Sequence, residues 1–388
     1  MRYCTRCILP ETRPGITLDA EGVCTACRGH DDKVRHIDWS GRADALKAIV
    51  DRAKSRSTGY DCVVPVSGGK DSWYQVIQCQ RLGLNPLAVT WRTPGRTTLG
   101  QRNLDGLIRH LGVDHIDYTL NPDVERRFMK KAFERVGAVG LPMHMALFAI
   151  PLKMAVQMRI PLVVWGENPQ LEYGGEEAER QATRLDQAWL ARHGCLMGTT
   201  VEDWIDEEAT GDDRLTAREL TAWRVPTFEG AQADFVPESI FLGAFMPWDS
   251  FENVKAAQAH GFEYAESDRR MGTWSFADID CEFMSLHHYL KWFKFGFTRA
   301  FDNLSVQIRQ GQLTRDEAIE RLSALGPQHP HADIEAFCAF VGEPVEWFYR
   351  VCERFRDPKV WQQRVFHTSS GPTQRWEIPD FIVEPWSW

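Results

Sequence analysis

The 388-residue sequence lacks several features that would place it in a known class of protein. No apolar run is long enough to cross a membrane, and the N-terminus lacks the apolar core of a signal peptide. A basic excess is also missing: the formal net charge is -9, which disfavours a partner as acidic as long nucleic acid. These absences predict a cytoplasmic protein with no membrane span and no nucleic-acid partner.

A disulfide framework is absent as well, because the ten cysteines are scattered apart from one cluster. The sequence has no internal repeat and no low-complexity tract. Its 43% hydrophobic and 26% charged residues are typical of a soluble globular protein. The chain is longer than a domain with a single hydrophobic core usually is, so we expect more than one domain.

Two C-x-x-C pairs form the cysteine cluster: Cys4 and Cys7 in "YCTRC", and Cys24 and Cys27 in "VCTAC". Each pair can present two thiolates from one tight turn, and two such turns complete a tetrahedral zinc site. Four cysteine ligands leave no open coordination position, so the pattern predicts a structural zinc knuckle and not a catalytic site. Two unrelated pairs, or redox pairs, are the alternative.

The stretch "YDCVVPVSGGKDSWYQVIQCQRLG", from Tyr60 to Gly83, reads as a strand, a glycine turn and a helix. Backbone N–H groups at a helix N-terminus after such a turn favour an anion, so the turn is predicted to hold phosphate. It is not a Walker A loop, because Val64 occupies the place of the first glycine and Asp71 follows the lysine. An ordinary turn with an incidental glycine pair is the alternative.

The string "SGGKDS" resembles the S-G-G-x-D-S signature of the PP-loop ATP pyrophosphatases. The resemblance implies that ATP is bound, that pyrophosphate is released and that AMP is transferred to a substrate oxygen. It assigns the pyrophosphate cradle to the serines and glycines and Mg²⁺ binding to the aspartate. Lys70 fills the variable position. The residues so implied for cofactor binding are Ser67, Gly68, Gly69, Lys70, Asp71 and Ser72.

Apolar strands and amphipathic helices alternate beyond this loop, which argues for a parallel sheet with helices on both faces. The remaining strands are predicted in "NPLAVTWRT", "HIDYTL", "PLVVWGE" and the start of "IFLGAFMPWDSFENVKAAQAHG". Ligands in such sheets bind beyond the carboxyl ends of the strands. This rule adds Thr90 and the loop "WGENPQLEYGG" to the site, with Trp248 and Asp249 at the end of the last strand.

Two residues of "WGENPQLEYGG" are candidate catalytic residues because they directly follow a buried strand. Glu167 is predicted to ligate Mg²⁺ or orient a substrate, and Asn168 to hydrogen-bond a carbonyl or hydroxyl group. A polar loop with a glycine hinge is the alternative. The charged segment that follows, about 176–230, is predicted to be a solvated insertion or lid.

The C-terminal part is helix-patterned and rich in aromatic residues. Lys291, Lys294 and Arg299 lie in an otherwise apolar run beside His287 and His288, and could clamp phosphates from a second domain. Lysines that extend from a buried helix to water are the alternative. We therefore expect three regions, a knuckle over 1–40, a PP-loop domain over 41–265 and a helical domain over 266–388.

Five strings together resemble the N-acetyl sugar amidotransferases of surface-polysaccharide biosynthesis, a PP-loop family. They are "YCTRCILPETRPGITLDAEGVCTAC", "VPVSGGKDS", "WGENPQLEYGG", "LGAFMPWDS" and "LHHYLKWFKFGFTRAFD". The resemblance runs from Met1 to about Leu322 and is poor over 176–230. Where the family has Arg-Ala-Thr-Asp this chain has "RAFD", which keeps Arg299 and puts the role of Asp302 in doubt.

The resemblance implies an α/β, Rossmann-like PP-loop enzyme that converts the acetamido group of a nucleotide-linked N-acetyl sugar into an acetamidino group. The residues and the resemblance together give Lys70, Asp71, Glu167, Asn168, Lys294 and Arg299 as candidate catalytic residues, and ATP, Mg²⁺ and structural Zn²⁺ as expected cofactors.

A separate glutaminase, similar to that of imidazole glycerol phosphate synthase, is the implied source of ammonia. The chain itself shows no glutaminase motif: Arg2 follows Met1, and Cys195 sits in "HGCLMG". Two other functions stay open, a PP-loop enzyme of the tRNA-thiolation type and a non-catalytic nucleotide-binding subunit. The acidic balance and the lack of a central C-x-x-C argue against the first, and the intact loop argues against the second.

Overall fold

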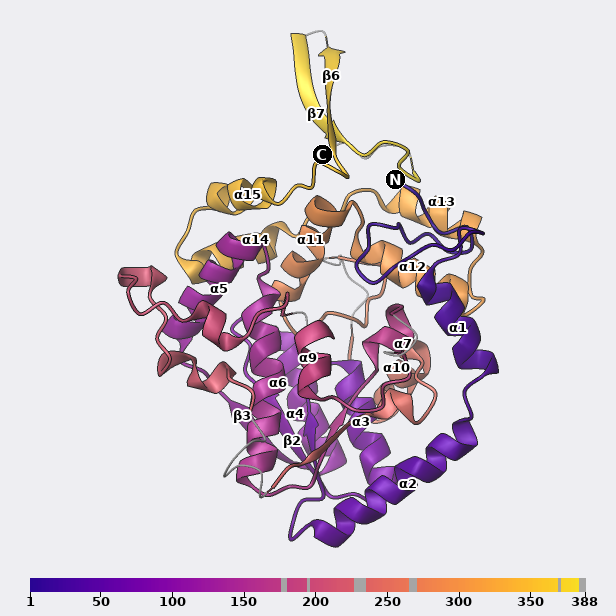
Figure 1. The fold of residues 1–388 in the computed structure, drawn as a ribbon, viewed down its shortest axis with the longest axis vertical. Helices are drawn as coiled ribbons and strands as arrows, with labels where there is room; N and C mark the ends of the chain where they lie inside the picture. The colour runs from indigo at the N-terminus through magenta and orange to yellow at the C-terminus, as the bar shows by residue number, and fades with distance from the viewer. Residues whose placement is uncertain (176–179, 194–195, 227–234, 265–270, 369–370, 384–388) are drawn as a thin grey trace.

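The computed structural model describes residues 1–388 except 176–179, 194–195, 227–234, 265–270, 369–370 and 384–388 (Figure 1). Its centre is a five-stranded parallel sheet with the order β3-β2-β1-β4-β5. The strands are β1 (Cys62–Pro65), β2 (Pro86–Trp91), β3 (Asp114–Tyr118), β4 (Leu162–Trp165) and β5 (Glu238–Phe241). The predicted parallel sheet is confirmed, and the later strand does return to it.

Strands β1, β2 and β4 are buried along their whole length, which explains why they read as continuous apolar runs. In register, Cys62 pairs with Pro86 on one side and Leu162 on the other. The carboxyl ends of β1 and β4 are therefore neighbours. This register brings the SGGKDS loop after β1 and the loop after β4 to the same edge of the sheet.

Helices cover both faces of the sheet. The helices of the sheet region are α2 (Trp39–Arg56), α3 (Lys70–Arg81), α4 (Thr98–Leu111), α5 (Pro122–Val136), α6 (Gly140–Gln157), α7 (Pro169–Tyr173) and α10 (Ser250–Gln258), with a 3-10 turn, η5 (Leu242–Ala244). The chain runs from β1 through β2 to β3 in one direction and returns to β4 in the other. Right-handed crossovers then place α3 and α4 on one face and α5 and α6 on the opposite face.

The C-terminal part contributes α11 (Phe283–Phe295), α12 (Arg299–Arg309), α13 (Arg315–Leu325), α14 (His331–Val341) and α15 (Val345–Arg354). Phe133 of α5 packs against Phe337 and Phe348, so α14 and α15 share the core of the sheet region. A second apolar cluster joins the cysteine knuckle to α12 and α13. The helical region is confirmed, yet its core is continuous with that of the sheet across residue 265.

The knuckle leads into α1 (Thr25–Arg35) and lies against α12 and α13 (Figure 1). Arg315 donates through Nε to the carbonyl oxygens of Cys4 and Cys7, at 3.3 and 3.2 Å. The backbone N–H of Ile8 donates to Ser305 Oγ at 3.4 Å. The N-terminal knuckle is therefore built onto the C-terminal helices.

The chain ends in an antiparallel hairpin, β6 (Gln362–Thr368) and β7 (Gly371–Glu377), which projects from the body (Figure 1). The predicted helical C-terminal region therefore also contains a hairpin, which the sequence analysis did not predict. After the hairpin, Ile378 and Val383 are buried and the Phe381 ring lies 5.4 Å from that of Trp292. The aromatic tail packs on its own domain as far as the described residues extend.

The described part of the charged insertion comprises α9 (Gln187–His193) and the 3-10 turns η1 (Val201–Trp204), η2 (Gly211–Asp213) and η3 (Glu219–Trp223). Trp204 and Trp223 are fully buried against Phe128 of α5. Trp223 also donates through Nε1 to the Pro142 carbonyl at 3.1 Å. This packing differs from the predicted solvated insertion or lid, because two tryptophans fix the segment to α5 and α6.

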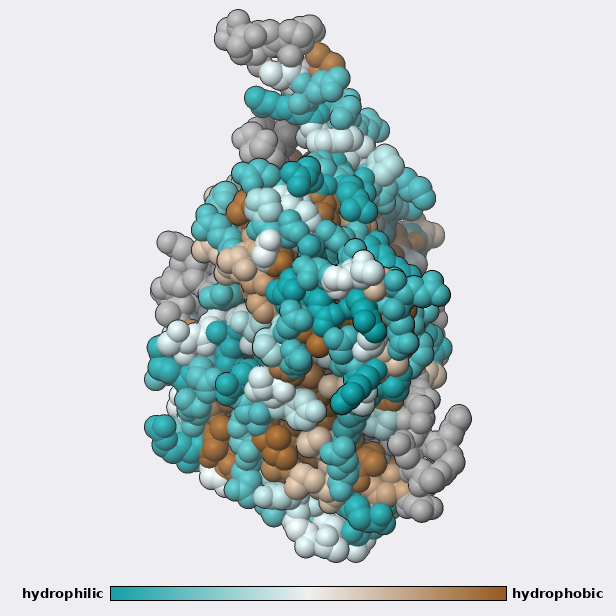
Figure 2. Space-filling model, turned by 90° about the vertical axis from the view of Figure 1, so that its left-hand side faces the viewer, coloured by the Kyte–Doolittle hydropathy of each residue, from teal (hydrophilic) through white to brown (hydrophobic). Residues whose placement is uncertain are grey.

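The molecular face in Figure 2 is mostly hydrophilic, with apolar atoms gathered in separate groups near its lower end. Within the described ranges, no helix combines the length and the apolar composition that a membrane crossing requires.

Truncation of a buried tryptophan of the insertion should test its structural role. Trp223→Ala removes a buried ring and its hydrogen bond, so we expect the free energy of unfolding to fall by about 3–5 kcal/mol. Trp376→Ala, on the exposed hairpin, should cost less than about 1 kcal/mol. Chemical denaturation measures both values. Equal losses in the two variants would contradict the packing described for the insertion.

Candidate active site

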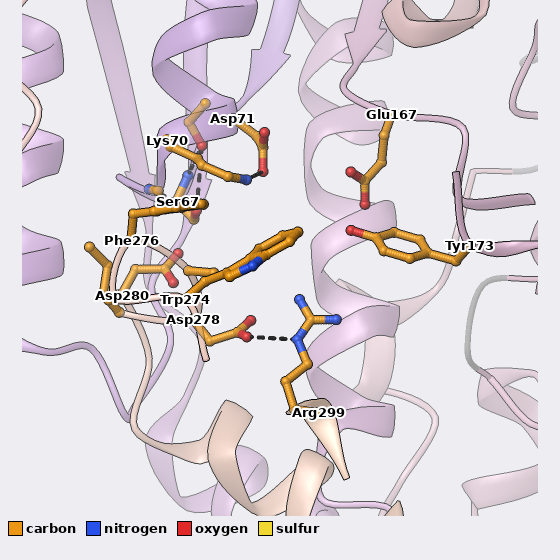
Figure 3. A pocket seen from close by; sticks show the side chains of 14 residues that line it. Ser67, Lys70, Asp71, Glu167, Tyr173, Trp274, Phe276, Asp278, Asp280 and Arg299 are labelled. Atoms are coloured by element: carbon orange, nitrogen blue, oxygen red, sulfur yellow. Dashed lines mark hydrogen bonds and ion pairs between the residues drawn. The ribbon is translucent and has the colours of Figure 1, made fainter. Parts of the chain in front are cut away.

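A pocket of about 190 Å³ lies at the carboxyl edge of the sheet, between the SGGKDS loop and the C-terminal region (Figure 3). It is lined by residues from four parts of the chain: Ser67, Gly69, Lys70, Asp71, Ser72, Glu167, Tyr173, Trp274, Phe276, Ala277, Asp278, Ile279, Asp280 and Arg299. The structure thus brings most of the predicted loop residues together with Glu167 and Arg299.

The SGGKDS loop owes its shape to close backbone packing. Gly68 has a φ of +95°, and a Cβ there would lie 2.6 Å from the Gly100 carbonyl oxygen of α4. The Ser67 N–H donates to Ser72 Oγ at 2.9 Å, and the Gly69 N–H donates to Ser67 Oγ at 3.3 Å. Helix α3 begins at Lys70 after Gly69, which has no side chain to cap it. The first N–H groups of α3 therefore remain for an anion.

Residues 271–282, here called the strap, cross from the C-terminal region to the loop. The strap pairs with the segment before α4: the Thr97 N–H donates to the Asp280 carbonyl at 3.1 Å, and Thr97 Oγ1 donates to the Ile279 carbonyl at 2.5 Å. A Cβ at Gly100 would lie 2.6 Å from Asp280 Cα. This contact places Asp278 and Asp280 beside the loop.

Four carboxyl side chains line the pocket with two basic ones: Asp71, Glu167, Asp278 and Asp280, with Lys70 and Arg299. Lys70 Nζ lies 2.5 Å from Asp71 Oδ2, and Asn253 Nδ2 donates to the other oxygen at 3.2 Å. Burial, reinforced by the charge of Asp71, raises the pKa of Glu167 to about 7. Burial also raises the pKa of Asp280. Carboxyl groups that resist ionisation together fit a bound cation, whose charge would restore the carboxylates.

Arg299 supplies positive charge from the opposite side of the pocket (Figure 3). Its Nε lies 3.1 Å from Asp278 Oδ2. Burial alone would raise the pKa of Asp278, but Arg299 and His288 hold it well below its usual range. Near Glu167, burial and that carboxyl group raise the pKa of Tyr173. The pocket therefore combines an ionised Asp278–Arg299 pair with a neutral phenol.

Four predicted site residues lie outside the pocket lining. Gly68 packs on α4, as described above. Thr90 Oγ1 donates to the Val66 carbonyl at 2.7 Å, and Asn168 caps α7 by accepting from the Gln170 N–H at 3.0 Å. Lys294 donates to the Val136 carbonyl at 2.7 Å. The roles predicted for Thr90, Asn168 and Lys294 stay predictions, and each side chain has a structural contact in this conformation.

Other residues named from the sequence have structural contacts in this conformation. Asp249 caps α10 by accepting from the N–H groups of Phe251 and Glu252, while Trp248 is buried against the Tyr74 ring. Asp302 is buried outside the pocket and pairs with Arg13 at 2.7 Å.

The strap carries the functional residues that sequence reasoning missed, namely Trp274, Phe276, Asp278 and Asp280. The aspartates stand in "ADID", an acidic pair at alternate positions, which is the one local signal available. Tyr173 was inside a quoted motif without an assigned role. Nothing local shows that the strap crosses to α4, because that contact joins residues about 180 positions apart.

The four predicted zinc ligands meet in one place. The sulfur atoms of Cys4, Cys7, Cys24 and Cys27 all lie within 4.8 Å of one another, and all four residues are buried. Backbone N–H groups of Arg6, Cys7 and Cys24 donate to Cys4 Sγ at 3.3–3.4 Å. Such N–H···S bonds favour thiolates. Four converging sulfurs with this support fit a tetrahedral zinc ion.

A family model matches part of the C-terminal region. Residues 262–371 match the model described as "LPS biosynthesis protein WbpG-like, C-terminal domain". We call this part of the chain, which is similar to that C-terminal domain, the WbpG-like domain. The WbpG-like domain carries the strap and Arg299, so it completes the pocket over the SGGKDS loop. The resemblance to proteins of surface-polysaccharide biosynthesis is confirmed for this part of the chain.

Two solved structures are similar to part of the chain at low identity. NMN synthetase from Francisella tularensis is 16% identical, covers 48% of this chain and 92% of its own, and gives a TM-score of 0.27. An NH₃-dependent NAD synthetase from Campylobacter jejuni is 16% identical with the same coverage and a TM-score of 0.28. No curated protein matches the chain in sequence.

Metal analysis of the purified chain should find about one zinc ion per protomer, as a four-ligand site requires. Cys24→Ser should lose the ion and lower the thermal midpoint, because metal binding contributes to folding. Cys338→Ala, at a buried cysteine of α14, should keep the ion. A Cys24→Ser protein with the zinc content and thermal midpoint of the unaltered chain would contradict the assignment.

Proposed function

We propose that this protein is an ATP-dependent amidotransferase of LPS or O-antigen biosynthesis. It would convert the acetamido group of a nucleotide-linked N-acetyl sugar into an acetamidino group, with release of AMP and pyrophosphate. One observation carries the proposal: the SGGKDS loop opens into a pocket that is closed by a WbpG-like domain. The loop supplies the nucleotide chemistry, and the domain relates it to LPS biosynthesis.

The loop side of the pocket suits the phosphates of ATP. Ser67, Ser72 and the first N–H groups of α3 provide donors, and Lys70 provides a cation. Asp71, with Glu167 or Asp280, would hold Mg²⁺, which neutralises phosphate charge when it is bound. The raised pKa values of Glu167 and Asp280 fit this arrangement, since both carboxyl groups need a cation nearby to ionise.

The reaction proceeds in two displacements. The acetamido carbonyl oxygen attacks the α-phosphorus of ATP, and the electron pair of the broken P–O bond leaves with pyrophosphate. The product is an O-adenylyl imidate that keeps its nitrogen-bound proton. Ammonia then adds to the imidate carbon, the C–O bond breaks with its electron pair going to AMP, and one ammonia proton passes to solvent. The remaining group is an amidinium.

The chain's own residues act by positioning and by charge. No side-chain nucleophile is needed, because the substrate oxygen attacks directly. Arg299 lies across the pocket from the loop and would face the negative charge of the reacting phosphate. Trp274 and Tyr173 also line the pocket and would exclude water from the adenylated carbonyl. Exclusion matters because water competes with ammonia for that carbon.

Ammonia would come from a separate glutaminase. Free ammonia is scarce at neutral pH, where most of it is ammonium. A partner that delivers it must reach the pocket near the carboxyl edge of the sheet.

Asp71→Asn should reduce Mg²⁺-dependent AMP formation by about a hundredfold or more, because the amide cannot balance the metal charge. Its fold should be intact, since the side chain is 37% exposed. Asp105→Asn, the same change on the exposed face of α4, is the control and should behave as the unaltered chain does. AMP is followed with ATP and candidate acetamido sugars. AMP formation by Asp71→Asn at the unaltered rate would contradict the assignment.

The chain alone should use ammonium but not glutamine. The unassisted rate should rise with pH and with ammonium concentration, because unprotonated ammonia is the nucleophile. Nitrogen-labelled glutamine or ammonium, followed into the amidine, measures this directly. Glutamine hydrolysis by the isolated chain, coupled to product, would contradict the two-protein scheme. Pyrophosphate release that depends on tRNA would instead support the thiolation-type function.

A further inference from the structure

A buried chain of charged side chains joins the cysteine knuckle to the pocket. Arg13 lies between the two cysteine pairs, and its Nε is 2.7 Å from Asp302 Oδ1. The second oxygen of Asp302 lies 3.3 Å from Lys291 Nζ and 3.9 Å from Arg299 Nη1. Arg299 in turn lies 3.1 Å from Asp278 in the pocket. The knuckle is thus connected to the pocket through ionic contacts.

The position of Arg299 depends on a balance between two carboxylates. Its Nε is at hydrogen-bond distance from Asp278, whereas its Nη1 is farther from Asp302. Asp302 is only 3% exposed, and Arg13 occupies the oxygen of Asp302 that does not face Lys291 or Arg299. With the Asp302 charge largely matched, Arg299 is left to pair with Asp278.

The backbone of the strap restricts Arg299 as well. Gly272 has a φ of +88°, and a Cβ there would lie 2.9 Å from Arg299 Cγ. The aliphatic stem of the arginine is therefore packed tightly, and its freedom lies mainly in the guanidinium end. That end is the part within reach of both aspartates.

We propose that Arg13 and Asp302 are positioning residues that hold the Arg299 guanidinium toward the pocket. This inference rests on the proposed function in so far as Arg299 faces the reacting phosphate. Without Arg13, the buried Asp302 carboxylate would have a poorly matched charge and would draw Arg299 away from Asp278. The knuckle would then contribute to the reaction, although its metal takes no part in the chemistry.

Removal of Arg13 should leave the knuckle attached. Ile8 and Arg315 still join it to α12 and α13, and the second apolar cluster packs the two parts together. A loss of activity can therefore be separated from a loss of structure.

The test compares Arg13→Gln with Arg6→Gln, a matched change in the same knuckle. Arg6 pairs with Asp31 at 2.6 Å, its side chain is 45% exposed, and the pair lies outside the network. Arg13→Gln should lower kcat/KM by about tenfold, the size expected for coupled charges. Arg6→Gln should leave it unchanged. Both variants should keep their zinc, and Arg13→Gln should remain folded with a lower thermal midpoint than Arg6→Gln, because it leaves a buried carboxylate less well matched.

A double-mutant cycle shows whether Arg13 acts through Arg299. In an Arg299→Gln background, Arg13→Gln should have little further effect on the rate, since the group it positions is gone. Arg13→Gln with Asp302→Asn should recover part of the activity, because no unmatched carboxylate remains. Additive losses in the first pair would overturn the proposal, as would an Arg13→Gln enzyme with unaltered kcat/KM.

The structure of the Arg13→Gln protein tests directly whether Arg13 holds the Arg299 guanidinium toward the pocket, and this test does not depend on the reaction. The Arg299 guanidinium should turn from Asp278 to Asp302. An Arg299 that stays on Asp278 would overturn the proposal even if activity fell. If the unaltered chain releases no pyrophosphate with any acetamido sugar, the proposed function fails, and this structure still supports or overturns the network.

Discussion

The contact between the strap and the segment before α4 is the interaction on which the site depends. The N–H and the hydroxyl of Thr97 both donate to strap carbonyls, and Gly100 lets the two backbones touch. Through this contact the WbpG-like domain closes over a loop that lies about 200 residues earlier in the chain. Without it, Asp278 and Asp280 would not face Ser67 and Asp71.

Electrostatics divides the resulting pocket into two halves. Near the loop, carboxyl groups crowd together and burial raises the pKa of Glu167 and Asp280, which favours a cation between them. Across the pocket, Asp278 is ionised beside Arg299. The metal–phosphate complex that the proposed function requires would suit both halves, because carboxylates favour a cation while backbone N–H groups and an arginine favour phosphate.

The sequence predicted what depends on local pattern. Buried strands such as β1 and β4 read as apolar runs, the SGGKDS string marked the loop, and the spacing of the four cysteines predicted their convergence. It could not predict the strap, whose partners are distant along the chain, or the hairpin. Site roles were predicted for Thr90, Asn168 and Lys294 from their distance to strand ends or from their charge. The side of a strand or helix that a residue faces depends instead on tertiary packing, which the local sequence does not show.

The charged insertion is a second case in which local composition did not predict tertiary packing. Its charge predicted exposure, whereas Trp204 and Trp223 fix it to α5. A few large apolar side chains determine how this charged segment packs, because each buried ring contributes far more to the free energy of folding than a surface charge does.

The central claim is that the substrate's amide oxygen attacks ATP in this pocket. The most direct measurement uses an acetamido sugar whose carbonyl oxygen carries a heavy isotope, with ammonium as nitrogen donor, and weighs the AMP produced. Attack by that oxygen predicts one labelled oxygen in AMP and an amidine that has lost the label. Unlabelled AMP formed together with the amidine would contradict the account.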